Sequence, residues 1–180
     1  PAPVNTQNPS SVTTTSNSTK QVNWKSVTSS SVFNLYKNAG LSVGDDDKPT
    51  LLKEIDLTGD GIPEAIFSAS TGNASSSVIL ISNSDGSVSV AKTKDKNSKI
   101  GNAEVWEAGM ATYSMGYKLL PNEKGFYTDS RSASSGEENG DVIIFRCNPD
   151  SIAAYQWNSK TNLFEYNSTL TAKYTAIECK

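Results

Sequence analysis

A short acidic segment, residues 56–64, holds the side chains of this 180-residue chain that are best suited to bind a metal ion. Its oxygen-bearing side chains stand at the first, third, fifth and ninth positions: Asp56, Thr58, Asp60 and Glu64. Calcium takes six to eight hard oxygen ligands, which alternate side chains and a backbone carbonyl, here that of Ile62, can supply. Gly61 stands at the sixth position, where calcium loops need a sharp turn. These residues predict a calcium site, and the segment is named the acidic loop.

The residues after the acidic loop predict a strand rather than the helix of an EF-hand. An EF-hand has a bidentate Glu at its twelfth position and a helix on each side. The twelfth residue here is Phe67, and the run Ala65-Ile66-Phe67 suits a strand. Three carboxylates gathered without a cation would repel one another, which favours a bound ion. The alternative is a glycine-rich hairpin turn that binds no metal.

Residues 56–67 resemble the calcium loop of FG-GAP and VCBS-type repeats, in which Asp-x-Asp/Asn-x-Asp-Gly-x-x-Asp precedes a hydrophobic strand. Thr58 stands where that pattern has a stronger ligand, and Glu64 stands where it has Asp. The resemblance covers about a dozen of the 180 residues. It therefore implies a calcium loop more directly than it implies a fold.

The layout of the whole chain is similar to that of small periplasmic immunity and lysozyme-inhibitor proteins. Those proteins combine an anchored polar tail, one calcium loop and a late Tyr-x-Trp/Phe-x-Tyr hairpin, which residues 155–166 match in outline. The similarity implies a domain that plugs the active cleft of a secreted cell-wall hydrolase. It rests on layout and not on a diagnostic motif.

Around the acidic loop, the pattern of apolar residues predicts a mainly β fold with one short N-terminal helix. The expected strands are residues 51–55 and 65–70 on either side of the loop, 78–81 and 88–90 as one hairpin, and 155–157 and 164–166 as another. Residues 30–39 form the expected helix, with Gly40 at its C-terminal end. This spacing indicates antiparallel hairpins in a sandwich or a small propeller-like sheet array.

The chain divides into a polar tail and one folded domain. Residues 1–22 are rich in Ser, Thr and Asn, and they predict a flexible tether because they offer too little apolar surface to fold. Residues 23–180 predict a single calcium-binding β domain. Such a tail often follows a signal peptide or a lipid-anchored cysteine, so an N-terminal membrane anchor ahead of Pro1 is a further expectation.

The two cysteines, Cys147 and Cys179, are predicted to form a disulfide. The bond would contribute roughly 3–4 kcal/mol on the chain-entropy model, and it requires an oxidising compartment. Together with the polar tail, it indicates a periplasmic, cell-surface or secreted protein. Two unrelated buried thiols are the alternative.

Composition excludes several classes of function. The chain has no His, which removes Ser-His-Asp and Cys-His catalysis within it. Its net charge of −3 and its lack of a basic run argue against nucleic-acid binding. No apolar run reaches the length of a transmembrane helix. Glu104 and Glu107 flank Trp106, and because glycoside hydrolases use two carboxylates, this pair keeps such an activity as an alternative. Glutamates that only lie on the surface are the other interpretation of the pair.

Residues 130–140 form the predicted partner-binding loop. This stretch is polar and carries Arg131, Glu137 and Glu138, so its acidic side chains could attract a basic partner. A mobile linker is the alternative. We expect a non-enzymatic domain that binds another protein, with inhibition of, or immunity to, a cell-wall hydrolase as the sharpest version. An adhesin or surface-recognition module is the second hypothesis, and a glycoside hydrolase is the third.

Overall fold

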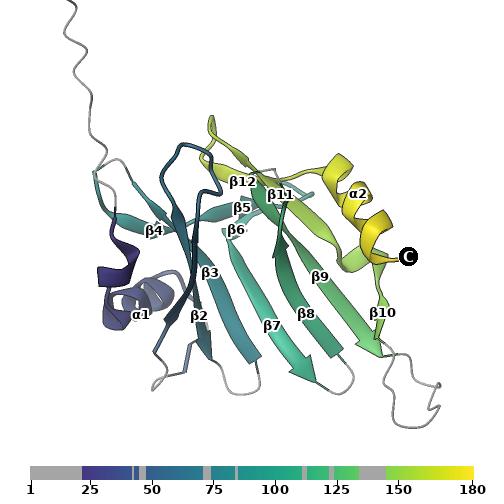
Figure 1. The fold of residues 1–180 in the computed structure, drawn as a ribbon, viewed down its shortest axis with the longest axis horizontal. Helices are drawn as coiled ribbons and strands as arrows, with labels where there is room; N and C mark the ends of the chain where they lie inside the picture. The colour runs from purple at the N-terminus through teal and green to yellow at the C-terminus, as the bar shows by residue number, and fades with distance from the viewer. Residues whose placement is uncertain are drawn as a thin grey trace, which may run out of the picture.

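The computed structural model describes residues 22–41, 43–44, 48–70, 74–83, 85–110, 113–121, 124–133 and 145–180, and it is mainly β (Figure 1). Within these ranges, twelve strands join in one sheet, accompanied by two α-helices and two 3-10 helices. No helix in the same ranges has the length and apolar character needed to cross a membrane. Residues 1–21, nearly all of the predicted tether, lie outside the described residues.

The two α-helices lie near the two ends of the described chain, and strands fill most of the sequence between them. The helical elements are η1 (Trp24–Ser26), α1 (Ser29–Asn38), η2 (Pro149–Ser151) and α2 (Ser168–Glu178). The strands are β1 (Thr50–Ile55), β2 (Glu64–Ser70), β3 (Ala74–Ser82), β4 (Val88–Val90), β5 (Lys92–Lys94), β6 (Ile100–Asn102), β7 (Glu104–Met110), β8 (Tyr113–Leu119), β9 (Gly125–Ala133), β10 (Phe145–Cys147), β11 (Ala153–Asn158) and β12 (Leu163–Tyr166).

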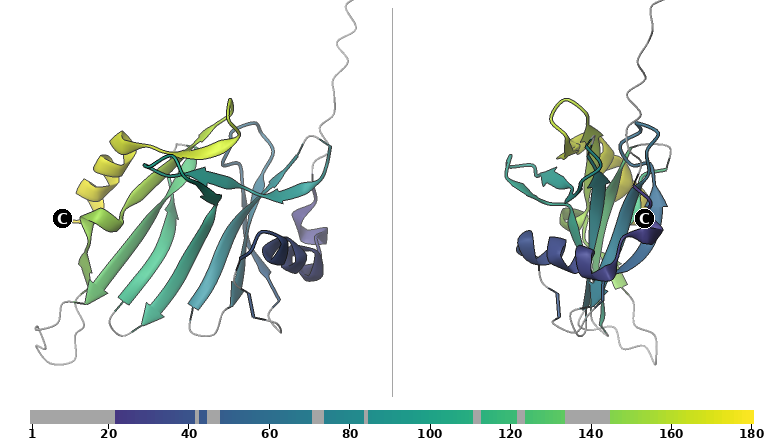
Figure 2. Two further views of the ribbon diagram at one scale, coloured as in Figure 1. Left: turned by 180° about the vertical axis from the view of Figure 1, so that it is seen from behind. Right: turned by 90° about the vertical axis from the view of Figure 1, so that its left-hand side faces the viewer.

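The sheet is curled, because its last strand in sequence, β12, pairs with β5 from the middle of the chain. Its order is β1-β2-β3-β7-β8-β9-β11-β12-β5-β6, while β4 pairs with β3 and β10 pairs with β9. Only Ala91 separates β4 from β5, yet β5 pairs with β12, so this short crossing brings the two halves together (Figure 1, Figure 2). The pairing of β12 with β5 is parallel, whereas the paths through the predicted hairpins are antiparallel.

The prediction of a mainly β fold with antiparallel hairpins and an N-terminal helix is confirmed. In the first predicted hairpin, Leu80 of β3 pairs with Val90 of β4. In the second, Trp157 of β11 pairs with Phe164 of β12. The sequence left a sandwich and a propeller-like array open, and the strands instead form one continuous curled sheet.

Small side chains let the curl close around a core. Ala91 and Ala103 are fully buried, and backbone hydrogen bonds run from Ala91 N–H to the Ile79 carbonyl (2.9 Å) and from Ala103 N–H to the Ala91 carbonyl (2.8 Å). Larger side chains would hold these backbones apart. The remaining buried members of this core are Leu57, Ile66, Ile79, Val105, Phe126 and Phe164. Leu57 belongs to the acidic loop, so the loop is anchored in the same core.

Helix α1 packs on one end of the sheet and begins at a polar cap. The Thr28 hydroxyl accepts a hydrogen bond from the Ser31 N–H (3.2 Å), which satisfies a free backbone group of the first turn. Val32 and Tyr36 are fully buried on its inner face. The Tyr36 hydroxyl lies 2.9 Å from the carbonyl oxygens of both Phe67 and Ser76, so it connects the helix to β2 and β3.

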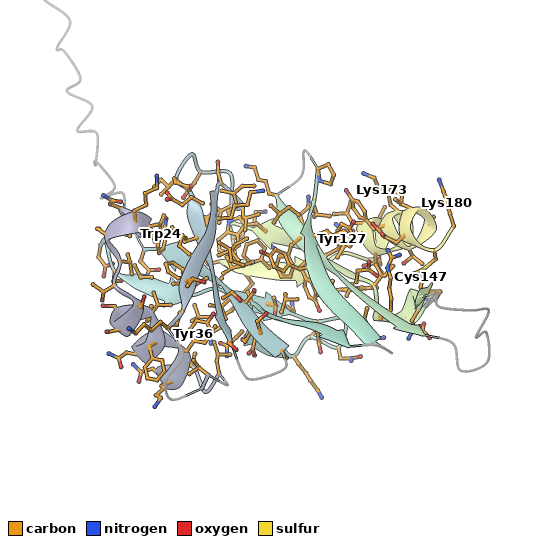
Figure 3. All side chains as sticks on the ribbon, turned by 60° about the horizontal axis from the view of Figure 1, so that its bottom comes forward. Trp24, Tyr36, Tyr127, Cys147, Lys173 and Lys180 are labelled. Atoms are coloured by element: carbon orange, nitrogen blue, oxygen red, sulfur yellow. A yellow bond between two sulfur atoms is a disulfide. The ribbon has the colours of Figure 1, made fainter. Side chains whose placement is uncertain are left out.

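Helix α2 was not predicted, and it covers the other end of the sheet (Figure 1). The Asn167 side chain caps it by accepting a hydrogen bond from the Leu170 N–H (3.0 Å). Leu170 and Tyr174 are buried, and the Tyr174 ring stacks on that of Tyr127 at 4.4 Å. Figure 3 shows Trp24 and Tyr36 at the α1 end of the molecule, and Tyr127 and Cys147 at the α2 end.

Candidate metal centre in the acidic loop

Strands β1 and β2 hold the acidic loop between them as the connection of a hairpin. Ile55, the last residue of β1, pairs with Glu64, the first residue of β2. The predicted strand–loop–strand arrangement is therefore confirmed. Four of the five predicted ligands, Asp56, Thr58, Asp60 and Ile62, lie in the connection, and the fifth, Glu64, closes it.

Two buried contacts fix the acidic loop to the rest of the domain. The Leu57 side chain is 2% exposed and packs in the core of the curl. Near the end of the loop, the Trp24 indole N–H donates a 2.6 Å hydrogen bond to the Pro63 carbonyl, and the Trp24 side chain is itself 1% exposed. The loop is thus held at both ends by parts of the chain distant in sequence.

Carboxylates of the loop accept hydrogen bonds from its own backbone. Gly59 and Gly61 have φ of +74° and +85°, a left-handed conformation that glycine adopts without steric cost. This path turns both of their N–H groups toward the Asp56 carboxylate, which accepts from Gly61 at 3.1 Å and also from Gly59. Asp60 accepts from the Ile62 N–H at 2.7 Å. The side chains of Asp56 and Asp60 are exposed.

Glu64 is a buried residue, 3% exposed, whose carboxylate holds the backbone of the loop by hydrogen bonds. It accepts hydrogen bonds from the N–H groups of Leu57 (2.6 Å) and Thr58 (3.0 Å) and from the Thr58 hydroxyl (3.3 Å). Burial is the largest cause that raises the pKa of Glu64 to about 7, and the nearby Asp60 and Asp56 carboxylates raise it further. The two backbone hydrogen bonds act in the opposite direction.

The donor set of the acidic loop fits calcium, although the side chains are not gathered around one point. In the described residues, no three acidic, His or Cys side chains converge closely enough to hold a metal ion. A carboxylate has about four acceptor directions. Asp60 uses one of them within the loop, Asp56 two and Glu64 three. Each carboxylate thus retains capacity for a further partner, and the side chains of Asp56 and Asp60 are open to solvent.

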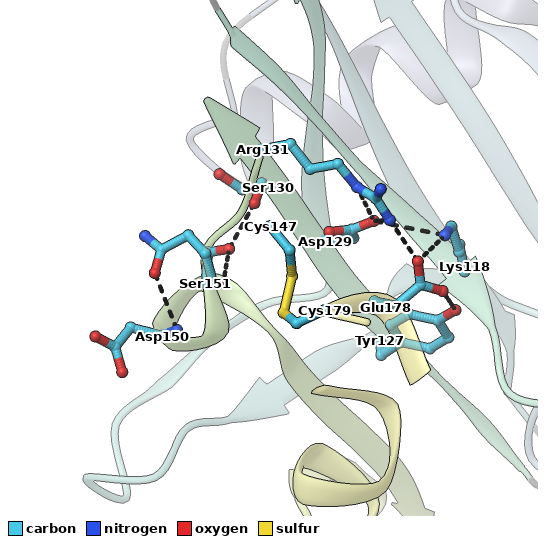
Figure 4. The surroundings of a disulfide bond; sticks show 11 residues. Lys118, Tyr127, Asp129, Ser130, Arg131, Cys147, Asp150, Ser151, Glu178 and Cys179 are labelled. Carbon is cyan, nitrogen blue, oxygen red and sulfur yellow. Dashed lines mark hydrogen bonds and ion pairs between the residues drawn. A yellow bond between two sulfur atoms is a disulfide. The ribbon is translucent and has the colours of Figure 1, made fainter. Parts of the chain in front are cut away.

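The predicted disulfide is present, with the Cα atoms of Cys147 and Cys179 5.2 Å apart (Figure 4). It joins the end of β10 to the residue that follows α2. Cysteines that pair in this way are compatible with an extracytoplasmic compartment.

A charged cluster that the sequence did not reveal lies beside the disulfide (Figure 4). Glu178, at the end of α2, accepts from Lys118 Nζ (2.6 Å) and from the Tyr127 hydroxyl (2.7 Å), and it also pairs with Arg131. The Arg131 guanidinium donates to Asp129 from two nitrogens, at 3.0 and 2.9 Å. These cations, Lys118 foremost, lower the pKa of Glu178. The cluster fastens the end of α2 to β8 and β9.

The predicted partner-binding residues have different outcomes. The prediction of a loop over residues 130–140 is wrong for residues 130–133, which belong to β9, and Arg131 forms ion pairs there with Asp129 and Glu178. Glu137 and Glu138 lie outside the described residues. Glu104 and Glu107 are the glutamates considered for a glycoside hydrolase. Glu104 accepts a 2.6 Å hydrogen bond from the Ser76 hydroxyl, and the side chain of Glu107 lies outside the described residues.

Comparisons of the chain with protein-family models, with curated proteins and with solved structures found no match. The function must therefore be inferred from the residues of the acidic loop and from the contacts that position them.

Proposed function

We propose that this chain is a calcium-binding β domain that works outside the cytoplasm by binding another protein. The observation that supports calcium binding is the acidic loop. Its five oxygen ligands lie on a backbone path that two left-handed glycines preset. All five donors are hard oxygens, which calcium prefers. The disulfide and the polar N-terminal residues support the extracytoplasmic part.

In this proposal, calcium is held by the carboxylates of Asp56, Asp60 and Glu64 together with the Thr58 hydroxyl and the Ile62 carbonyl. When bound, the ion supplies positive charge to a loop that carries three acids. The chain itself supplies the preset backbone and the anchors at Leu57 and Pro63. Since the loop joins β1 to β2, we expect bound calcium to stabilise this edge of the sheet. We assign it no catalytic role.

Calcium is expected to raise the melting temperature of the wild-type chain and to do so much less for Asp60→Asn. At calcium concentrations about one hundred times Kd, binding adds about 2.7 kcal/mol to the free energy of unfolding. Asn keeps the oxygen that accepts from the Ile62 N–H (2.7 Å), so the variant loses a charged ligand but not the turn. The measurement is thermal unfolding in EDTA and in calcium at concentrations up to about 100 mM, which is about one hundred times the weakest expected Kd.

Asp85→Asn is the matched control for that experiment. Asp85 accepts from the N–H of Ser87, two residues ahead, at 2.8 Å, which is the same local hydrogen bond that Asp60 makes. Asp85 lies in the turn between β3 and β4 and is not one of the residues of the acidic loop. This variant should retain the full calcium response. Coincident melting curves with calcium and with EDTA for the wild type would refute the calcium proposal.

In its most specific form, the proposal names a cationic cell-wall hydrolase as the partner. Its support is the similarity of layout described above, together with the pairing of β9 with β10. Ala133 of β9 pairs with Phe145 of β10, and the disulfide holds the end of β10. Glu137 and Glu138 lie between these two strands in sequence, and the proposal assigns the contact with the partner to them.

The wild type is expected to inhibit at least one member of a panel of lysozyme-like enzymes. Charge reversal of both Glu137 and Glu138 to Lys should then slow association, and less so at high salt, because charges at the rim of an interface act mainly on the rate of encounter. Glu54→Lys, at an exposed position on β1, is the control. Inhibition of no member would favour the adhesin hypothesis, and inhibition unaffected by the reversal would discard these two glutamates as the contact.

A further inference from the structure

A lysine from a distant turn lies on the acidic loop. Lys124 precedes β9, and its Nζ donates a 2.9 Å hydrogen bond to the carbonyl oxygen of Gly59. The two residues are 65 positions apart in sequence. Gly59 stands between Thr58 and Asp60, which are two of the proposed calcium ligands. A positive charge of the chain itself therefore lies beside the proposed site.

The acidic loop has room for this lysine because residue 59 is a glycine. A Cβ atom on Gly59 would lie 1.7 Å from Cε and 1.8 Å from Nζ of Lys124. Gly61, the other left-handed glycine of the loop, has nothing within 4 Å of the corresponding position. The two glycines thus share a backbone conformation, but only Gly59 accommodates a side chain from elsewhere in the domain.

The backbone of Lys124 is held in place by β11, so its side chain reaches out from a fixed base. The Lys124 carbonyl accepts a 3.0 Å hydrogen bond from the Trp157 N–H. The next residue, Gly125, approaches β11 so closely that a Cβ there would lie 2.0 Å from the Tyr155 carbonyl oxygen. The lysine therefore connects the acidic loop to the part of the sheet formed by β9 and β11.

We propose that Lys124 is the resident cation of the acidic loop, and that it opposes calcium and thereby sets the affinity of the site. The inference rests on the proposed calcium function. Without calcium, the ammonium group offsets part of the charge of Asp56 and Asp60. With calcium, the same group repels a dication nearby, so it weakens binding and favours a site that fills only at high calcium concentration.

The test is calorimetric titration of calcium chloride into the full chain and three variants. Lys124→Met removes the charge and keeps most of the stem, while Lys124→Arg keeps the charge. Lys173→Met removes a charge from α2, at the other end of the molecule (Figure 3). Each protein is titrated at about 20 mM and about 300 mM ionic strength, because salt screens exposed charges.

Lys124→Met is expected to bind calcium roughly three to ten times more tightly than the wild type at low ionic strength, with a smaller difference at high ionic strength. Lys124→Arg and Lys173→Met should bind as the wild type does. Equal or weaker binding by Lys124→Met would overturn the role of Lys124 and leave the calcium proposal standing. Absence of binding by all four proteins would overturn both.

Discussion

Removal of the disulfide between Cys147 and Cys179 is expected to lower the free energy of unfolding by about 3–4 kcal/mol. The two cysteines are 32 residues apart, and on the chain-entropy model a loop of this length contributes that much by restricting the unfolded chain. For a domain of this size the loss corresponds to a fall in melting temperature of about 10 °C. The measurement is thermal or urea unfolding of the double variant Cys147→Ser/Cys179→Ser.

The fold should survive this loss, because α2 has other attachments. Leu170 and Tyr174 remain buried against the sheet, and Glu178 keeps its ion pairs with Lys118 and Arg131. The control is the wild type treated with reductant, which should match the untreated double variant. A double variant as stable as the oxidised wild type would show that the bond contributes nothing to the folded domain.

In EDTA, the wild type is expected to lose about 2–3 kcal/mol of stability as the pH rises from about 5 to about 8. The cause is Glu64, whose pKa in the folded chain, about 7, lies above the ordinary value of 4.5. The folded state therefore binds the proton more tightly than the unfolded state does. The resulting stabilisation is complete below the ordinary pKa and is lost as the pH rises through 7.

Glu64→Gln should abolish this pH dependence, because the amide stays neutral throughout the range. Without calcium at about pH 8, the variant should be more stable than the wild type by up to about 3 kcal/mol, whereas calcium should stabilise only the wild type. Glu54→Gln, at an exposed position on β1, should leave the profile unchanged. A wild-type profile that is flat in EDTA, or one that rises with pH, would refute the role given to Glu64.

The features that the sequence predicted well are those with local signals. In the acidic loop, the alternation of oxygen-bearing side chains, Gly61 and the following apolar run all lie within a dozen residues. The hairpin between β3 and β4 and the helix α1 likewise have their apolar pattern and their turn residues close together. The pairing of Cys147 with Cys179 needed only the assumption of an oxidising compartment, since the chain has no other cysteine.

The features that the sequence did not predict depend on contacts between distant segments. The pairing of β5 with β12 joins strands about 70 residues apart in sequence, and no local pattern encodes it. Helix α2 is rich in Thr, which has a low helix propensity, and its signal is reduced to Leu170, Tyr174 and Ile177 at helical spacing. The contact of Lys124 with Gly59 spans 65 positions and has no signature in either segment.

The most direct test of the account is a calorimetric titration of calcium into the wild-type chain after removal of bound metal with EDTA. We expect one ion per chain with a Kd on the order of 10⁻⁵ to 10⁻³ M, since Thr58 contributes no charge to the ligand set. Binding should be weaker in Asp60→Asn and unchanged in Asp85→Asn. A titration with no saturable heat, together with a melting temperature that calcium does not change, would contradict the assignment of the acidic loop as a calcium site.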